Sequence, residues 1–382
     1  MKKIKYINKI DEIEGLSNHE KTQLKTVTER FAFRSNEYYL SLIDWSDPDD
    51  PIRQLIFPQV NELMEWGKCD PSEESNYTVI PGLQHKYPST ALLLVSNVCG
   101  GICRYCFRKR IFFKDNSDVL KNLPKAISYL KDHKEITNVL LTGGDPLMVS
   151  TRRLSNIIEQ IAEIDHIKIV RIGTKMLSFN PYRILNDPLL TDMITKYNNR
   201  NRRIYIMSHF SHTREITEEA YNAIIMLQKA GAIILNQTPI IKKVNDSPHV
   251  LAELFQKMSF IGITPYYVFQ CRPSLGNKIY AVPLEEAYGI FEKAREQVSG
   301  ISKRARFVMS HSTGKLEIIG LTESQIYLKY HRAADSKYSA QFMIYKRNPE
   351  AYWYDDYTGL FAGSSVPCDT EVNYENLSMA LA

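Results

Sequence analysis

The pattern of hydrophobic and polar positions divides the chain of 382 residues into three parts. Residues 1–88 carry amphipathic segments, and Ser17 and Glu20 have the spacing of a helix capping box, so this part is predicted to be mainly helical. Residues 89–300 alternate short apolar runs with helix-length amphipathic segments. Residues 301–382 change to strand-like runs followed by a tyrosine-rich acidic tail. We therefore expect an N-terminal helical region, a core and a β-containing C-terminal region.

The short apolar runs of the core have the length and composition of buried β-strands. They cover residues 90–97 (TALLLVSN), 136–142 (ITNVLLT), 167–173 (IKIVRIG), 203–208 (RIYIMS), 232–237 (AIILNQ) and 265–270 (PYYVFQ). Because helical segments separate the runs, the pattern predicts βα units and a parallel sheet. The expected fold is α/β, with a partial (βα)6 barrel favoured over an open doubly wound sheet.

Composition and charge narrow the functional classes. Hydrophobic residues make up 44% and charged residues 24%, which is typical of a soluble globular protein. The sequence has no apolar run of about 18 residues, and its basic start has no signal-peptide core, so we expect a cytoplasmic protein without membrane binding. The net charge of +5 includes no long basic block, and nucleic-acid binding therefore has no support.

Three of the six cysteines, Cys99, Cys103 and Cys106, form a cluster immediately after the first core run. The loop that follows a parallel strand is where α/β folds place their active sites. Three thiolates at this spacing suit a 4Fe–4S cluster with one iron left open, because iron–sulfur clusters need soft thiolate ligands. A zinc site and a chance group of thiols remain the alternatives.

A second motif, GGDP at Gly143, Gly144, Asp145 and Pro146, ends the second core run. Alone, GGDP would be interpreted as a turn. Together with the cysteines, it resembles the radical S-adenosylmethionine enzymes, in which a GGEP-type motif contacts the methionine amino group of the cofactor. The glycines allow close approach of the backbone to a ligand, and the Asp145 carboxylate can pair with an ammonium.

From about residue 30 to 350 the chain resembles the lysine 2,3-aminomutase family, which includes glutamate and protein-lysine variants. The resemblance depends on HKYPSTALLLVSNVCGGICRYCFRKR, LLTGGDPLM, SHFSH, LNQTPIIKKVND and PYYVFQCRPSLG. It implies a 4Fe–4S cluster, S-adenosylmethionine and pyridoxal phosphate as cofactors. It also implies a 5′-deoxyadenosyl radical that starts amino migration on an imine of pyridoxal phosphate. A flavodoxin or ferredoxin as reductant and a homo-oligomer are expected as well.

The resemblance assigns roles to individual residues. The three cysteines match the cluster ligands, and Arg108 matches the arginine that pairs with the substrate α-carboxylate. His209 and Gln237 match residues that line the S-adenosylmethionine site, and Lys315 matches the lysine that forms an imine with pyridoxal phosphate. Without the resemblance, Arg108 would be interpreted as a surface cation, His209 as a barrel histidine and Lys315 as a solvated lysine.

Two positions depart from the lysine-specific pattern and change the expected substrate. Where that pattern has aspartates for the distal ammonium of lysine, this chain has Arg272 and Ser310. A buried arginine would repel a lysine side chain, so a small, non-lysine and possibly acidic amino acid is expected. The alternative is that Arg272 forms a structural ion pair with a carboxylate of the core.

The predicted phosphate-binding arm also departs from the family pattern of two arginines and a tyrosine. This chain has Lys86, Tyr87 and Thr90 there, so one cation is lost from a site for a dianion. The glycine-rich loop before Lys315 is shortened to STGK. The alternative function is therefore a radical enzyme of the same fold that works without pyridoxal phosphate on another small molecule or on a peptide or protein side chain.

The remaining cysteines are expected to have no catalytic role. Cys368 stands alone, whereas the lysine enzymes carry a terminal cysteine cluster for structural zinc. Cys69 and Cys271 are interpreted as small buried hydrophobic residues.

Overall fold

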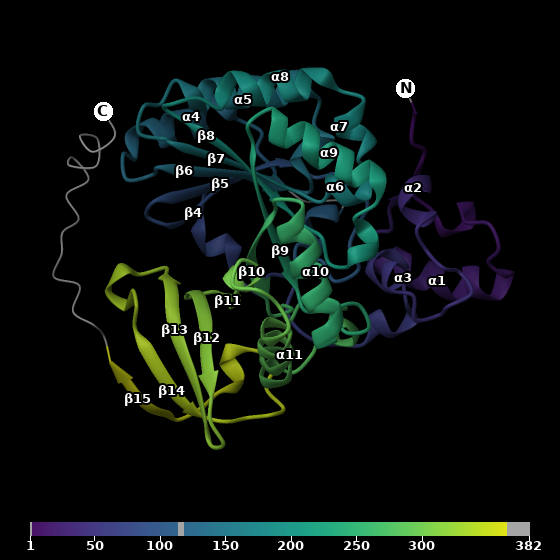
Figure 1. The fold of residues 1–382 in the computed structure, drawn as a ribbon, viewed down its shortest axis with the longest axis vertical. Helices are drawn as coiled ribbons and strands as arrows, with labels where there is room; N and C mark the ends of the chain where they lie inside the picture. Colours follow the sequence, from purple (N-terminus) through teal and green to yellow (C-terminus); the bar gives the residue numbers. More distant parts are fainter. Residues whose placement is uncertain (1, 114–117, 365–382) are drawn as a thin grey trace.

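A single continuous sheet organises the molecule. The structure is a computed structural model that describes residues 2–113 and 118–364. Within them, β3 to β15 form one 13-stranded sheet in which each strand pairs with its neighbours in the sequence. Figure 1 shows the parallel part of this sheet with its helices in teal and green, and the antiparallel C-terminal part in yellow.

All six predicted core strands are present and parallel. They are β5 (Thr90–Ser96), β6 (Asn138–Gly143), β7 (Ile169–Thr174), β8 (Arg203–Ser208), β9 (Ile233–Pro239) and β10 (Thr264–Phe269). A doubly wound sheet would reverse its strand order at a switch point, whereas these strands run in consecutive order. The prediction of a partial (βα)6 barrel is confirmed.

Helices connect the parallel strands and cover the outer face of the barrel (Figure 1). They are α4 (Leu123–Asp132), α5 (Thr151–Ala162), α6 (Met176–Phe179), α7 (Tyr182–Leu185), α8 (Pro188–Tyr197), α9 (Glu218–Lys229), α10 (Pro248–Phe260) and α11 (Leu284–Glu296). Across the described residues, every helix is too short or too polar to cross a membrane.

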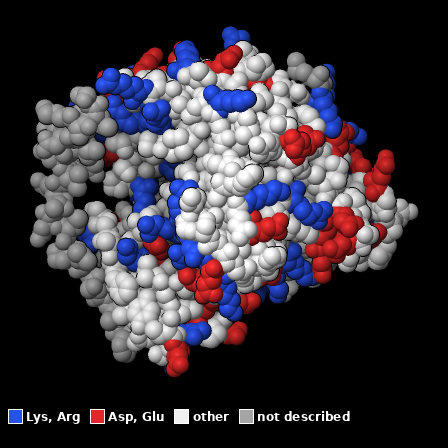
Figure 2. Space-filling view, viewed as in Figure 1, with Lys and Arg blue, Asp and Glu red and all other residues white. Residues whose placement is uncertain are grey.

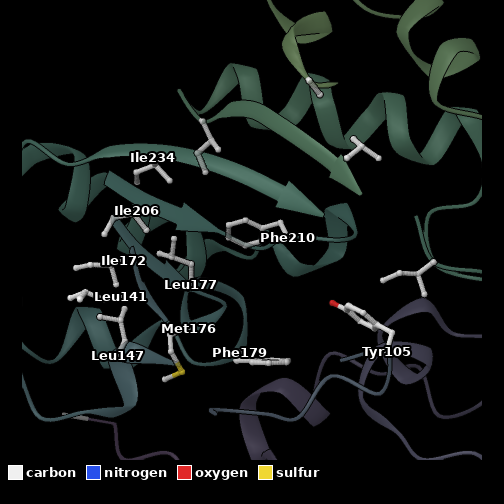
Figure 3. Close-up of a cluster of buried hydrophobic side chains, with 14 of the residues drawn as sticks. Tyr105, Leu141, Leu147, Ile172, Met176, Leu177, Phe179, Ile206, Phe210 and Ile234 are labelled. Atoms are coloured by element: carbon white, nitrogen blue, oxygen red, sulfur yellow. The ribbon is translucent and has the colours of Figure 1, made fainter. Parts of the chain in front are cut away.

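Alternation along the strands separates the hydrophobic core from the interior of the barrel. One set of side chains packs in the core, and Figure 3 shows it as a row from four adjacent strands: Leu141, Ile172, Ile206 and Ile234. Side chains that point to the other face of the same strands line the cavity: Leu140, Arg171, Met207 and Gln237. The barrel wall therefore presents aliphatic residues to the helices and chemically diverse residues to its interior.

The C-terminal part extends the same sheet instead of forming a separate layer. β11 (Arg306–His311) pairs in parallel with β10, and the strands after it are antiparallel. These are β12 (Gly314–Leu321), β13 (Gln325–Ala333), β14 (Phe342–Lys346) and β15 (Leu360–Ser364). The change of direction brings the β12–β13 hairpin, and with it Lys315, back towards the barrel interior.

The N-terminal part contains helices but also strands that the sequence did not predict. The helices are α1 (Asn18–Arg30), with the expected Ser17–Glu20 capping box, α2 (Glu37–Leu40) and α3 (Pro51–Ile56). β1 (Tyr6–Ile7) and β2 (Ser35–Asn36) form a small separate sheet. β3 (Thr78–Ile80) and β4 (Leu83–Tyr87) join the edge of the large sheet. The sequence did not predict β4, because its polar residues interrupt the alternation of hydrophobic and polar positions that is typical of a strand.

A buried ion pair attaches the N-terminal part to the cysteine loop. Arg104, between two of the cysteines, donates to both carboxylate oxygens of Glu62 at distances from 2.7 to 3.2 Å. The side chains are 1% and 0% exposed. Arg104 also donates to the Ala32 carbonyl oxygen, and Glu62 accepts from the Tyr280 hydroxyl. These bonds fix the position of the loop from the side opposite the barrel.

Removing the charge of Glu62 should destabilise the protein strongly. Glu62→Gln leaves the Arg104 guanidinium buried without a counterion, and we expect the free energy of unfolding to fall by about 3–5 kcal/mol. Anaerobic urea denaturation would measure the loss. Glu65→Gln, at an exposed position in the same segment, is the control and should change stability by less than about 0.5 kcal/mol. Equal stability of the two variants would contradict this role of the pair.

Candidate active site

The predicted site residues meet in one cavity inside the barrel. The cavity has a volume of about 340 Å³. Fifteen of the residues singled out from the sequence line it: Cys99, Cys103, Cys106, Gly143, Gly144, Asp145, His209, Gln237, Lys86, Tyr87, Thr90, Arg108, Arg272, Ser310 and Lys315. Pro146 does not line the cavity, because it is buried at the start of the short helix η5 (Pro146–Met148).

The three cysteines fit a cluster better than a single metal ion. Around one zinc ion, with Zn–S bonds of about 2.3 Å, sulfur atoms would lie only about 3.8 Å apart. The three sulfur atoms do not all come within 4.8 Å of one another. Within residues 2–113 and 118–364, His85, His133 and Glu135 are the group whose possible ligand atoms meet this distance. That group lies outside the cavity, and both ring nitrogens of His85 already have hydrogen-bond partners.

Burial keeps the thiols protonated until a metal binds. It raises the pKa of Cys103 to about 12, and raises the pKa of Cys99 and Cys106 as well. Thiolate ligands therefore depend on the positive charge of bound iron for their stabilisation. Soft sulfur donors on a wide, enclosed loop match the requirements of a 4Fe–4S cluster.

The GGDP motif holds the start of the cysteine loop by backbone contacts. The Gly144 amide donates to Ser96 and the Asp145 amide to Val98. A Cβ on Gly143 would lie 2.3 Å from the Ser96 carbonyl oxygen, and one on Gly144 would lie 2.5 Å from that of Val98. The glycines are therefore required by contact between two parts of the site, in addition to any contact with a ligand.

The Asp145 carboxylate is already hydrogen-bonded by protein groups. It accepts from the Thr174 hydroxyl and from the amides of Leu147 and Lys175, at 2.8 to 2.9 Å. Desolvation nevertheless raises its pKa to about 6. Pairing of this carboxylate with the ammonium of S-adenosylmethionine remains a prediction.

His209 and Gln237 lie on the wall of the same cavity as the cysteines. His209 follows β8, and its Nε2 is 3.0 Å from the hydroxyl of Tyr105, a residue of the cysteine loop. Burial lowers the pKa of His209 well below its usual value, so the imidazole is neutral at pH 7. Gln237 lies on β9, and the contact of both residues with S-adenosylmethionine remains a prediction.

Lys315 has the properties of an amine nucleophile. It lies on β12, and its Nζ is 4.2 Å from the centre of the Tyr267 ring and 4.8 Å from that of Phe269. Burial lowers the pKa of Lys315 well below the usual value, and the nearby charges of Arg272, Arg332, Arg171 and Lys86 lower it further. The interpretation of Lys315 as a solvated surface lysine is wrong.

Arg108 is buried and paired, not a surface cation. It donates to both oxygens of Glu74 at 2.7 to 3.1 Å, and its Nη1 donates to Thr142. Glu74 also accepts from Arg110 at 2.6 Å, and these charges hold its pKa far below the usual range. Glu74 lies in a turn-rich segment and carries no motif that would predict this role from the sequence. Binding of a substrate carboxylate by Arg108 stays a prediction.

Arg272 lines the cavity and, within residues 2–113 and 118–364, forms no ion pair of the kind that was its alternative interpretation. Its guanidinium stacks 3.5 Å from the centre of the Phe107 ring, and its Nη1 has no hydrogen-bond partner in the part of the chain that the structure describes. Burial lowers its pKa to about 10, partly offset by the charge of Glu74. The side chain therefore remains a cation at neutral pH and is available to an anion.

The predicted phosphate arm lies beside cations that sequence reasoning missed. Lys86 donates to the His311 carbonyl oxygen, and burial lowers its pKa to about 8. Arg171 on β7 and Arg332 on β13 also line the cavity. Their positions in sequence give no indication of this, because only the sheet register brings β13 next to Lys315. Figure 2 shows basic side chains gathered where the barrel meets the C-terminal strands.

The remaining cysteines differ in their exposure to solvent. Cys271 is buried, as predicted, but Cys69 is exposed, so the interpretation of Cys69 as a buried hydrophobic residue is wrong. The turn after Trp66 carries Cys69 to the surface next to Asp70. Cys368 lies outside the described residues.

Comparison with known proteins identifies the family. A family model described as the Radical SAM superfamily matches residues 93–255. An Aquifex aeolicus protein named "Putative L-lysine 2,3-aminomutase" is 51% identical over 94% of this chain and 97% of its own length. The chain belongs to the lysine 2,3-aminomutase family. The L-lysine 2,3-aminomutase of Clostridium subterminale is 39% identical over 69% of this chain and 62% of its own. The glutamate 2,3-aminomutase of Clostridioides difficile is 33% identical over 78% and 69%.

Family membership confirms the main predictions from the sequence. The protein is a radical S-adenosylmethionine enzyme, and enzymes of this class use a 4Fe–4S cluster and S-adenosylmethionine. Zinc and a chance thiol group are correspondingly disfavoured as explanations of the cysteines. The relatives carry lysine and glutamate names, so the family alone does not choose the substrate.

Replacing one cysteine should abolish cluster chemistry without unfolding the barrel. In Cys103→Ala, we expect loss of the iron–sulfur absorption after anaerobic reconstitution and loss of S-adenosylmethionine cleavage under dithionite, because one of three thiolate ligands is gone. Cys69→Ala is the matched control, because Cys69 is exposed and outside the cavity. Cleavage retained by Cys103→Ala would exclude this cysteine as a ligand.

Proposed function

We propose that the protein is a 2,3-aminomutase that acts on an acidic α-amino acid, with pyridoxal phosphate bound at Lys315. The observation that carries the proposal is the common cavity. It places the buried amine of Lys315 and the unpaired guanidinium of Arg272 together with the cysteine cluster. A substrate held at Lys315 would therefore share one cavity with Arg272 and with the cysteine cluster.

The environment of Lys315 suits a reactive amine. Burial and the nearby cations lower the pKa of Lys315, which favours the unprotonated amine that a bond to an aldehyde carbon requires. When bound there, pyridoxal phosphate supplies the aldehyde that holds the amino group during its migration. The rings of Tyr267 and Phe269 beside Nζ give an aromatic surface for a flat heterocycle.

The charges of the cavity favour an acidic substrate. Among the described residues, its lining includes seven Lys and Arg side chains, Lys86, Arg108, Arg171, Lys175, Arg272, Lys315 and Arg332, but only two carboxylates, Glu74 and Asp145. Glu74 is paired with two arginines, and Asp145 accepts three protein donors. The distal ammonium of lysine would find no free carboxylate, whereas a side-chain carboxylate could pair with Arg272. The relative named glutamate 2,3-aminomutase supports this choice.

Borohydride trapping tests the role of Lys315. We expect borohydride to fix pyridoxal phosphate on Lys315 of the reconstituted protein, as located by peptide mass spectrometry. Trapping should need a less alkaline pH than it would at an exposed lysine, because burial and the nearby cations lower the pKa of Lys315. Lys315→Ala should lose the adduct, and Lys346→Ala, an exposed lysine on β14, should keep it. A protein with its cluster assembled and no adduct would instead support the chemistry without pyridoxal phosphate.

Charge reversal at Arg272 tests the substrate class. Arg272→Asp should reduce kcat/KM for glutamate or aspartate at least about 100-fold, because a buried attraction becomes a repulsion. The same variant should gain measurable binding of lysine. Arg304→Asp makes the same change of net charge at an exposed position and should leave both properties unchanged. An unaltered affinity of Arg272→Asp for acidic amino acids would exclude this role.

A further inference from the structure

The sheet register places an arginine directly beside Lys315. Ser310 on β11 is the cross-strand partner of Lys315, and Lys315 is the partner of Arg332 on β13. Directly opposed residues of antiparallel strands project to the same face, with Cβ atoms about 4.5–5.5 Å apart. Gly314 permits the close contact of the two strands here, since a Cβ on it would lie 2.4 Å from the Arg332 carbonyl oxygen. Lys315 and Arg332 thus enter the cavity side by side.

Arg332 also contacts the predicted phosphate arm. Its Nη2 donates to the hydroxyl oxygens of Ser89 and Thr90, each at 3.1 Å. Its guanidinium stacks over the Tyr87 ring, 4.3 Å from the ring centre. Tyr87 ends β4, Ser89 lies in the turn and Thr90 begins β5, so the arginine connects the C-terminal strands to the other side of the cavity.

Among the described residues, Arg332 has no counterion, and some of its N–H donors form no hydrogen bond. Within the described residues it forms no ion pair, and its Nε and Nη1 form no hydrogen bond. Arg171, whose Nε donates to Asn138, also lacks an ion pair in this part of the chain. The two arginines are close enough for Arg332 to contribute to lowering the pKa of Arg171. An anion with several acceptor oxygens would relieve this repulsion.

We infer that Arg332 supplies the cation that the phosphate-binding arm lacks, so that a phosphate monoester binds between Arg332, Thr90 and Lys86. This inference rests on the proposed function, in which the monoester is that of pyridoxal phosphate held at Lys315. It explains how the chain tolerates Thr90 where the family pattern has an arginine: the charge is provided from β13, far away in sequence. Arg332 is then a binding residue of the cofactor site, and Arg171 reinforces the positive potential.

Comparing pyridoxal phosphate with pyridoxal, the same aldehyde without its phosphate, isolates the phosphate contact. Both would be titrated into the full-length protein with its cluster assembled, and the adduct on Lys315 would be quantified after borohydride. Wild type should prefer pyridoxal phosphate strongly. Arg332→Gln should reduce that preference at least about tenfold by weakening only the phosphorylated aldehyde, because a charge-assisted hydrogen bond is lost.

Two further variants control the measurement. Arg332→Lys keeps one charge and should retain part of the preference, and Lys346→Gln removes an exposed charge from β14 and should retain all of it. Thermal denaturation would show that each variant folds. If Arg332→Gln weakens both aldehydes equally, the arginine is only structural and the inference is wrong. If the preference is unchanged, the inference is wrong while the proposed function stands. If wild type forms no adduct on Lys315 with either aldehyde, both fail.

Discussion

The buried ion pair between Arg104 and Glu62 is the contact on which the geometry of the site depends. The cysteine loop leaves the barrel after β5, and the GGDP motif at the end of β6 holds its start. The ion pair, the Arg104 bond to Ala32 and the Arg34 bond to the Cys99 carbonyl oxygen hold it against the N-terminal part. One role of that part of the chain is therefore to position a loop of the barrel.

A surplus of buried positive charge dominates the remainder of the cavity. Burying cations without partners is costly, and here the cost is expressed as the lowered pKa values of Lys86, Lys315 and Arg272. In the proposed function, the same environment makes Lys315 a better nucleophile and favours anions in the cavity. Glu74 limits the surplus by pairing with Arg108 and Arg110. The proposed reactivity of Lys315 and the proposed preference for an acidic substrate thus depend on the same electrostatic condition.

The continuous sheet makes this condition possible. Because β11 runs parallel to β10 and the next strands reverse direction, residues far apart in sequence become cross-strand neighbours at the cavity. Ser310, Lys315 and Arg332 form a row across three strands, and this row meets the turn before β5. A separate C-terminal domain would have no fixed register with the barrel and could not place these side chains so closely.

The sequence by itself determined the parallel strands, the cysteine motif and the family, since these depend on local hydrophobic alternation and on short spacings. It also indicated Lys315 and Arg272 through the resemblance. Only the tertiary structure decided that Arg108 is paired with Glu74, that Arg272 lacks an ion pair among the described residues, and that Arg332 lies beside Lys315. Ion pairing and burial depend on strand register and on contacts across the cavity, which no local pattern of residues encodes.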